Sequence, residues 1–347
     1  MNLHILQNYS SPYIKKYVDF LEDNFSLHEH VCVCVEKEKP IDHRVIHVGN
    51  ALGVLFILVP LLFKAKKIFL HGLWDKYVIL TLFLFPVFLK KSYWLIWGGD
   101  LYSLFKKKRR LRSIFLDWAK KQVIKRLKGV VTHLKGDYEL VRDHFGFCGQ
   151  YLYTILYIRN VTVPEKSDGN IDKDFVQIGN SPDPTNNHEH LFELIAKTVP
   201  LNQEKYKKFV PLAYGNYAER IIKLKTQANH LFGAEHCYIL EDLRHLPDYI
   251  KLLSRVDVAL FDHDRQQAVG NIILLLSLGA TIYLRSDITT WSFLHEHGLI
   301  VRDIATLKAS KPLLRLQPQE VSQNRENIEK YFTEERAVML WRKIFNG

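Results

Sequence analysis

Short apolar segments rich in β-branched residues alternate along the chain with longer segments whose apolar residues recur at helical spacing. The apolar segments 31–35, 68–70 and 93–97 are typical of buried strands, and the stretches 13–24 and 112–128 are typical of helices. Strands that alternate with helices predict parallel sheets with helices on both faces. The hydrophobic pattern therefore predicts an α/β fold.

The alternation is interrupted once, by a polar stretch at 159–173 that contains Pro and Gly and lacks periodicity. Such a stretch is typical of a linker between domains. Alternation restarts after it, and a chain of 347 residues is long enough for two hydrophobic cores. We predict four parts: a first domain at 1–160, a linker at 161–173, a second domain at 174–318 and a C-terminal helical segment at 319–347.

Polar residues follow the predicted strands of the second domain, and in open α/β sheets the loops at the carboxyl ends of strands carry function. Two successive α/β domains also lead us to expect a ligand in a cleft between them. The loop at 179–188 is small and polar, and Gly179 and Ser181 allow backbone N–H groups to approach an oxygen-rich ligand closely. Tyr214 follows the next strand, and Glu241 follows the third with a carboxylate suited to ribose hydroxyls.

The fourth strand of this domain runs into a strongly polar loop, DHDRQQ at 262–267, and then into a helix. A helix N-terminus presents unpaired N–H groups to an anion, and Arg265 can hold phosphate oxygens by a bidentate contact. Gly270 permits close backbone approach, and Asn271 adds a side-chain donor. The alternative is a polar helix cap with a solvated Arg265, but the similar loops beside it favour a diphosphate site.

Asp262 and Asp264 flank a histidine in a pattern that resembles the Asp-x-Asp metal motif of some sugar-nucleotide enzymes. We expect no metal ion there, because Arg265 stands beside the two carboxylates and is suited to phosphate itself. The four cysteines form no CxxC pair and no cluster with zinc spacing, so we interpret them as free thiols. The sequence therefore predicts a site that works without a metal cofactor.

Candidate acid–base residues follow strands of the first domain. Asp100 comes after an aromatic strand and two glycines, where its carboxylate can accept a proton from a substrate hydroxyl. It can also cap a helix that starts at Leu101, and both roles are compatible. His71 ends another strand and is the second candidate base, although a single histidine is more often a structural hydrogen-bonding group. Asn8 follows the first strand.

The formal net charge of +11 favours an anionic partner, such as nucleic acid, an acidic lipid surface or a phosphorylated substrate. A basic run at 106–112 lies in the same domain as two very apolar segments, 51–63 and 78–89. Each apolar segment is too short to span a bilayer and contains a proline. Basic residues near such segments favour an anionic membrane surface, and we find no nucleic-acid-binding motif in the sequence.

Several of these stretches together resemble a known family, the 4-acetamido-4,6-dideoxygalactosyltransferases of enterobacterial common antigen synthesis, glycosyltransferase family 56. They occur in order and span most of the chain: IFLHG (68–72), YWLIWGGDLY (93–102), IGNSPDPTNNHEH (178–190), VPLAY (210–214) and RQQAVGN (265–271). The resemblance implies a GT-B fold, in which two Rossmann-like domains face a deep cleft and the C-terminal helix crosses back to the first domain. Asp262 and Asp264 are not part of the family pattern.

The resemblance also implies the substrates and the residues that hold them. The donor would be a dTDP-activated amino-dideoxy sugar, and the acceptor a polyprenyl-diphosphate-linked saccharide at the cytoplasmic face of the bacterial inner membrane. Asp100 and His71 are the candidate catalytic residues, and the acceptor side would include Asn8, Gly72, Gly98 and Gly99. The residues expected in the donor site are Gly179, Asn180, Ser181, Asn186, His188, Tyr214, Glu241, Arg265, Gln266, Gln267, Gly270 and Asn271.

Other functions remain open at this stage. A relative that acts in O-antigen or another surface glycan pathway is as compatible with the residues as the common-antigen enzyme. A nucleotide-sugar epimerase or hydrolase of the same architecture would need neither the apolar segments nor the basic run. A non-catalytic membrane-associated scaffold built on a degenerate GT-B fold would bind neither dTDP nor UDP.

Overall fold

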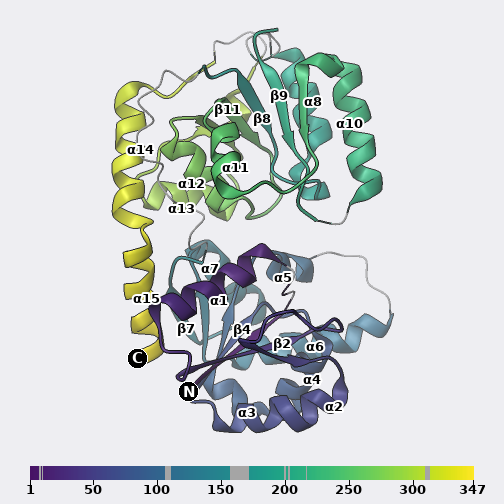
Figure 1. Cartoon of the computed structure of the whole chain (residues 1–347), viewed down its shortest axis with the longest axis vertical. Coiled ribbons are helices and arrows are strands. Elements are labelled where there is room, and N and C mark those ends of the chain that lie inside the picture. The colour runs from purple at the N-terminus through teal and green to yellow at the C-terminus, as the bar shows by residue number, and fades with distance from the viewer. Residues whose placement is uncertain are drawn as a thin grey trace. The chain divides into compact units, whose positions relative to one another are not determined.

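The computed structural model describes the chain except for residues 8, 10, 106–110, 157–171, 199–200, 202–203, 216 and 309–312. The chain forms two compact units (Figure 1). The first unit comprises Met1–Arg159 together with Glu334–Gly347, and the second comprises Asn160–Thr333. Each unit has its own parallel sheet, so the predicted α/β class is confirmed.

Seven parallel strands form the sheet of the first unit, in the order β3-β2-β1-β4-β5-β6-β7 across the described residues. Strand β1 therefore lies between β2 and β4, next to the point where the strand order reverses direction. The strands are β1 (Asn2–Leu6), β2 (His30–Val35), β3 (Val45–Val48), β4 (Lys67–His71), β5 (Ser92–Leu95), β6 (Gly129–Thr132) and β7 (Gln150–Tyr153).

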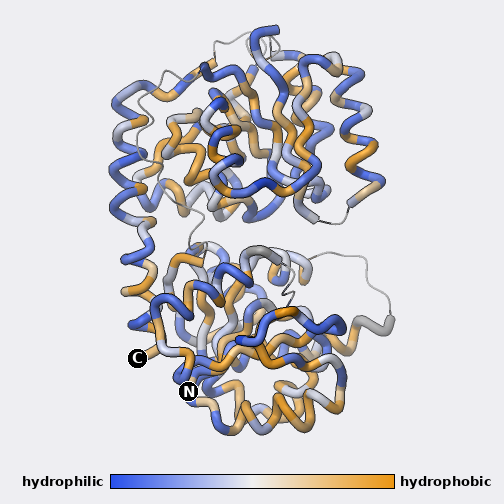
Figure 2. Tube along the Cα trace, viewed as in Figure 1, coloured by the Kyte–Doolittle hydropathy of each residue, from blue (hydrophilic) through white to orange (hydrophobic). Residues whose placement is uncertain are grey.

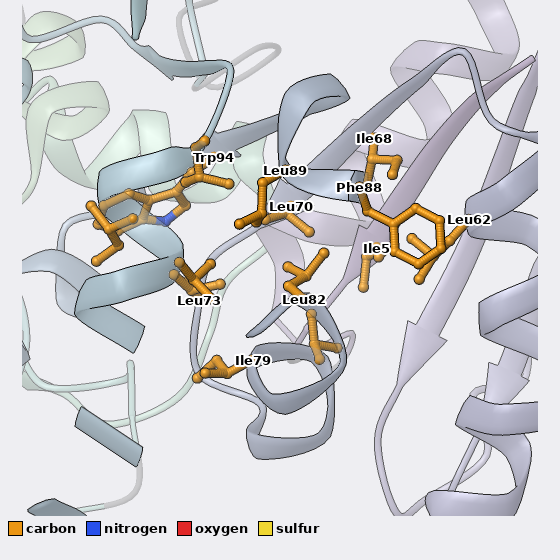
Figure 3. Close-up of a cluster of buried hydrophobic side chains, with 14 of the residues drawn as sticks. Ile5, Leu62, Ile68, Leu70, Leu73, Ile79, Leu82, Phe88, Leu89 and Trp94 are labelled. Carbon is orange, nitrogen blue, oxygen red and sulfur yellow. The ribbon is translucent and has the colours of Figure 1, made fainter. Parts of the chain in front are cut away.

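Alternate strand residues enter two different cores, as expected when successive side chains point to opposite faces of a sheet. Figure 3 shows part of one core, where Ile5, Leu70 and Trp94 gather with Leu82 and Phe88. The helical elements that contribute to it are η1 (Val54–Leu58), α3 (Val59–Lys64), α4 (Lys76–Leu84), η2 (Pro86–Lys91), α5 (Gly99–Tyr102), η3 (Ser103–Phe105), α6 (Leu111–Arg126) and α7 (Lys135–Phe145). The short helix α2 (Ala51–Gly53) leads into η1 and has no buried residue.

The opposite core holds Phe69 and Leu95 against two helices, α1 (Pro12–Asn24) and α15 (Glu334–Asn346). Trp341 of α15 is fully buried, and its indole N–H donates to the Ile155 carbonyl at 3.3 Å. The last helix of the chain is therefore an integral part of the first unit.

The second unit contains a six-stranded parallel sheet in the order β10-β9-β8-β11-β12-β13 across its described residues. Its strands are β8 (Phe175–Ile178), β9 (Lys207–Pro211), β10 (Cys237–Leu240), β11 (Val256–Phe261), β12 (Thr281–Leu284) and β13 (Arg302–Asp303). Its helices are η4 (Pro184–Asn186), α8 (His188–Lys197), α10 (Ala218–Phe232), η5 (Ala234–His236), α11 (Leu246–Leu253), α12 (Val269–Ser277), α13 (Thr289–Glu296), η6 (Ile304–Thr306) and α14 (Pro318–Tyr331).

The strand order of the second unit decides which loops meet. Strands β8 and β11 are neighbours in the middle of the sheet, although a long segment of chain separates them. The polar segments that follow them, 179–187 and 262–268, therefore leave the sheet side by side. The C-terminal sequence expected as one helical pattern forms two helices, because α14 ends at Tyr331 in the second unit and α15 begins at Glu334 in the first.

Candidate active site

The loops after β8 and β11 contact each other directly through their backbones. The Gly179 N–H donates to the Leu260 carbonyl at 2.9 Å, and the Asp264 N–H donates to the Thr185 carbonyl at 3.0 Å. These bonds extend the strand pairing beyond the sheet. Two predicted donor-site segments are thus parts of one structure.

Asn186 is the centre of a hydrogen-bond network that joins the two loops, and its side chain is fully buried. Its Oδ1 accepts from the Asn180 N–H at 2.9 Å, the Ser181 N–H at 3.3 Å and His263 Nε2 at 3.1 Å. Its Nδ2 donates to Ser181 Oγ at 3.3 Å and Gln267 Oε1 at 2.8 Å. Asn186 therefore holds the two loops together, because its amide is occupied by protein groups.

The backbone of both loops adopts an unusual conformation. Asn187 (φ 52°) and Ala268 (φ 58°) are the non-glycine residues with positive φ among those the structure describes. Such conformations are uncommon without glycine and cluster at functional sites. Gly179 has φ 64°, and a Cβ there would lie 2.6 Å from His188 Nε2. Glycine at 179 is thus favoured for two reasons, its backbone conformation and the buried histidine beside it. The expectation that its N–H faces a ligand is wrong, because this N–H donates to the Leu260 carbonyl.

Helix α12 begins at Val269, directly after the left-handed Ala268 at its N-cap. Asn271 donates from Nδ2 to Asn180 Oδ1 at 2.7 Å and accepts from the Tyr249 hydroxyl at 3.3 Å. Gly270 is buried in the first turn, and the following residues are apolar and buried. The structure therefore brings the helix N-terminus against the loop after β8, with Asn271 as a link between them.

Arg265 lies in the same group of loops and is only partly exposed. Its Nη2 is 3.2 Å from Asp183 Oδ2, and its Nη1 donates to the Gln266 carbonyl at 3.2 Å. The Tyr217 hydroxyl donates to the same Asp183 oxygen at 3.1 Å. Burial raises the pKa of Asp183, but hydrogen bonds from Thr185 and the charge of Arg265 outweigh it and lower the pKa overall. An aspartate therefore orients the guanidinium of Arg265, and its role as a phosphate ligand stays a prediction.

Two buried histidines belong to this region: His263 lies in the loop after β11, and His188 begins α8. Burial lowers the pKa of His188 to about 4 and that of His263 to about 3, so both are neutral at neutral pH. The ring nitrogens of His188 have no hydrogen-bond partner within the described part of the chain. His188 was expected in the site, whereas His263 was missed because the carboxylates on both sides of it are the more conspicuous residues. Neither the network nor its burial is visible from spacing alone.

The two aspartates beside His263 are engaged by basic side chains of the protein. Asp262 is 2.6 Å from His190 Nδ1, and Asp264 is 3.0 Å from Arg285 Nη1. Across the residues that the structure describes, there is no group of three or more His, Cys, Asp or Glu side chains that could hold a metal ion. That the site works without a metal remains a prediction.

The remaining donor-site candidates lie at different distances from the Asn186 network. Gln267 belongs to the network, since its Oε1 accepts from Asn186 and its Nε2 donates to the Thr185 hydroxyl. Gln266, the preceding residue, is also buried. Glu241 follows the edge strand β10 and pairs with Lys225 at 2.6 Å. Tyr214 is exposed in the loop after β9. The structure thus keeps Glu241 apart from the network, two strands away from β8.

In the first unit, His71 ends β4 and is fully buried. Its Nε2 is 3.3 Å from His4 Nδ1, and His4 Nε2 is 2.9 Å from His30 Nδ1. Burial lowers the pKa of all three rings, to about 3 for His71 and about 4 for His30. His71 is therefore one end of a chain of three neutral imidazoles. His4 was missed because it lies inside a strand, with no local sign of its partners.

The turn after β4 needs Gly72, which has φ 84° and lies against the ring of Trp74. Gln7 secures this turn: its Nε2 donates to the Gly72 carbonyl at 3.1 Å, and its Oε1 accepts from the Trp74 N–H at 2.7 Å and the Asp75 N–H at 2.8 Å. Asn8, the neighbouring acceptor-side candidate, lies outside the described residues.

Asp100 is fully buried in α5, which begins at Gly99 with Gly98 (φ 90°) as its N-cap. Its Oδ2 accepts from Trp94 Nε1 at 2.6 Å, and its Oδ1 accepts from the Trp97 N–H at 3.1 Å. The expectation of a cap for a helix starting at Leu101 is wrong, since Asp100 lies inside the first turn. Burial raises the pKa of Asp100, and the charge of Lys120 opposes this rise. Its assignment as the base stays a prediction.

A family model described as 4-alpha-L-fucosyltransferase, glycosyl transferase group 56, matches residues 50–344. The chain belongs to glycosyltransferase group 56. The match covers both units, including the loops around Asn186, Arg265 and Asp100. This group 56 enzyme is therefore a glycosyltransferase, as the resemblance of the short motifs predicted.

Solved structures share the fold of this group 56 enzyme at low sequence identity. WaaG, a glycosyltransferase of lipopolysaccharide biosynthesis, has a TM-score of 0.59 and 10% identity, with 100% of this chain and 95% of WaaG covered. A glycosyltransferase from Rickettsia africae has a TM-score of 0.65 and 8% identity, with 99% and 97% covered. Anabaena HepE, solved with UDP and glucose, has a TM-score of 0.64 and 10% identity, with 99% and 98% covered. The fold is GT-B.

None of the helices among the described residues is long and apolar enough to cross a membrane. Residues 106–110 of the basic run at 106–112 lie outside those residues.

Proposed function

We propose that this group 56 enzyme transfers an amino-dideoxy sugar, such as 4-acetamido-4,6-dideoxygalactose, from a dTDP-sugar to a polyprenyl-diphosphate-linked saccharide. The transfer would serve the synthesis of a bacterial surface glycan, common antigen or O-antigen, at the cytoplasmic face of the inner membrane. The family description names a fucosyltransferase. Fucose is 6-deoxygalactose, so the proposed sugar shares its deoxygenated C6.

The observation that carries the proposal is that Arg265, the N-terminus of α12 and the loop after β8 meet at the carboxyl ends of β8 and β11. The leaving group of the transfer is a nucleoside diphosphate, which gains negative charge as the bond to the sugar breaks. Unpaired N–H groups at a helix N-terminus and an oriented guanidinium stabilise that charge. The contacts of Arg265 with Asp183 and Gln266 use only part of its donor capacity, so other N–H groups are left for phosphate oxygens.

For the acceptor, we propose Asp100 as the base that removes the proton from the attacking hydroxyl, with His71 as the second candidate. Trp94 and Trp97 each donate to a different oxygen of Asp100, and each carboxylate oxygen has a further lone pair. A raised pKa lies closer to neutral pH, and a general base is more effective when its pKa is near the pH at which the enzyme works.

The proposal is tested by incubating the protein with the dTDP-sugar and a polyprenyl-diphosphate-linked acceptor and following the labelled sugar into the lipid. Transfer that requires the acceptor supports it, whereas consumption of the donor without acceptor would indicate the epimerase or hydrolase instead. A thermal-shift series with dTDP, UDP and GDP identifies the nucleotide. Stabilisation by none of them would favour the non-catalytic scaffold.

A further inference from the structure

The trace of α2, η1 and α3 is nearly continuously hydrophobic, as Figure 2 shows, and several of its side chains are exposed and form an apolar face of the first unit. Leu52 and Phe56 are 64% and 71% exposed. Exposed apolar patches of this kind mark interaction sites. The large apolar side chains that we assign to this face are Leu52, Leu55, Phe56, Phe63, Leu84, Phe85, Val87, Ile114, Phe115 and Trp118.

Ring contacts pack the elements that carry this apolar face against one another. The ring of Phe88 in η2 lies 4.9 Å from that of Phe63 in α3 and 6.2 Å from that of Phe85. The ring of Phe83 in α4 lies 6.1 Å from Phe115 and 5.2 Å from Trp118, both in α6. The exposed residues therefore lie on elements that pack together, α3 against η2 and α4 against α6.

A groove of about 200 Å³ runs into the apolar face between η1 and α4. Val54, Leu55 and Val59 line one side of it, and Leu80, Leu84 and Phe85 line the other. An open groove with such walls offers almost no hydrogen-bonding groups to a polar ligand. It matches the chemistry of a hydrocarbon chain.

The charge around the apolar face is strongly positive. The segment 51–91, which supplies most of it, contains six lysines and a single acidic residue, Asp75. Lys64, Lys76 and Lys90 are exposed. Lysines with apolar stems at the edge of a hydrophobic surface are suited to anionic lipid headgroups, whereas a protein partner would need complementary acidic groups of its own.

We propose that the apolar face enters the interfacial layer of an anionic lipid bilayer, with its lysines on the headgroup phosphates. A hydrocarbon chain of the same bilayer occupies the groove between η1 and α4. The inference rests on the proposed function, because the reason for membrane binding is that a polyprenyl-linked acceptor lies in such a bilayer. Binding itself needs no sugar, so it can be measured separately.

The first test is co-sedimentation of the full chain with phosphatidylcholine vesicles that contain phosphatidylglycerol. The double variant Leu52→Ser/Phe56→Ser is expected to bind more than about ten-fold more weakly, because two large apolar side chains no longer leave water. Ile222→Ser is the matched control, since Ile222 is 67% exposed on α10 of the second unit. Wild-type binding by the double variant, or no binding by the wild type, overturns the proposal.

The second test changes only charge. Replacing Lys64 and Lys90 by Gln is expected to weaken binding by about five-fold for each lysine, and this loss should vanish on vesicles of pure phosphatidylcholine. An equal loss on both kinds of vesicle contradicts the headgroup contact. Quenching by brominated phosphatidylglycerol reports position, and Trp118→Phe should remove part of the quenched tryptophan fluorescence. Quenching that is unchanged in this variant counts against insertion of α6.

Failure of this inference and failure of the proposed function give different results. Transfer to a short-chain, water-soluble acceptor analogue should be unchanged in Leu52→Ser/Phe56→Ser, whereas transfer to the vesicle-bound acceptor should fall with vesicle binding. Vesicle binding without any transfer rejects the function alone, and transfer without vesicle binding rejects the docking surface alone. If the double variant does not unfold cooperatively, Val87→Ser on η2 replaces it, with a smaller expected loss.

Discussion

The two units share a parallel α/β design, but they hold the candidate residues at their strand ends in different ways. In the second unit, Asn186 joins two neighbouring loops and leaves Arg265 partly exposed beside them. In the first unit, Asp100 and His71 are fully buried, and their hydrogen-bond partners include the Trp94 indole and the His4 imidazole. The carboxyl ends of strands thus carry two different arrangements. In the second unit, hydrogen bonds join polar loops that are partly exposed, and in the first unit the polar groups are enclosed in an aromatic core.

The largest effect is expected from Arg265→Ala, which tests the polar surface of the second unit. Transfer should fall by about 10²–10³-fold, because a positive group facing the developing charge of the diphosphate is lost. Thermal stabilisation by dTDP should fall as well, while the melting temperature without nucleotide changes little. Arg255→Ala is the matched control: Arg255 also pairs with an aspartate, Asp174, but at the amino end of β11. Equal transfer in both variants would reject the phosphate role.

Asp100→Asn tests the enclosed group of the first unit. Asn keeps an oxygen for the Trp94 indole, so the fold should persist while kcat falls by about 100-fold through the loss of the base. Burial raises the pKa of Asp100, so wild-type activity should decline on the acid side of a pKa above that of an ordinary aspartate. This acid limb should be absent from the residual activity of the variant. Full kcat in Asp100→Asn would make the residue structural.

Asn186→Leu removes the hydrogen bonds through which Asn186 joins the two loops of the second unit. It leaves the N–H groups of Asn180 and Ser181 without their acceptor, which should lower the free energy of unfolding by about 2–3 kcal/mol and weaken dTDP binding. Asn324→Leu is the matched control, because Asn324 of α14 is equally buried but its amide bonds to the backbone of Ile300, away from the two loops. The control should lose stability and keep its nucleotide affinity. Similar dTDP affinity in both variants would show that the hydrogen bonds of Asn186 do not shape the nucleotide site.

Both units contain buried histidines, so both should lose stability in acid. For His188 and His263, the pKa values lie at about 4 and about 3, below the ordinary 6.5. The unfolded chain therefore takes up protons first, and this stability is complete above pH 6.5 and is lost as pH falls toward 4. By pH 5, protonation of the unfolded chain has removed about 2 kcal/mol of stability for each such histidine. Denaturant unfolding at several pH values gives the dependence of the free energy of unfolding on pH. This dependence should be weaker in His188→Asn and unchanged in the exposed control His230→Asn.

The smallest effect is expected from removing divalent metals. Activity in EDTA should stay within about two-fold of the untreated protein, and Asp264→Asn should do the same. Asp264 already pairs with Arg285 at 3.0 Å, so its carboxylate is engaged within the protein. Loss of activity in EDTA that magnesium or manganese restores would return the two aspartates to a catalytic role.

Sequence reasoning succeeded where the information is local. The alternation of apolar segments identified both parallel sheets, and glycines at 72 and 179 were singled out where the backbone has positive φ. It failed for partners that come from different strands. His4 and His263 carry no local signal, because their roles come from side chains that the fold brings to them.

The sequence by itself determined the α/β class, the loops in which polar groups lie, and the membership in group 56, because periodicity and short motifs are properties of neighbouring residues. Only the tertiary structure decided which of those groups meet. Strand order puts β8 beside β11 and places β10 at the edge, so Asn186 joins His263 and Gln267 while Glu241 stays with Lys225. Strand order is set by the packing of all helices and strands together, and no single segment encodes it.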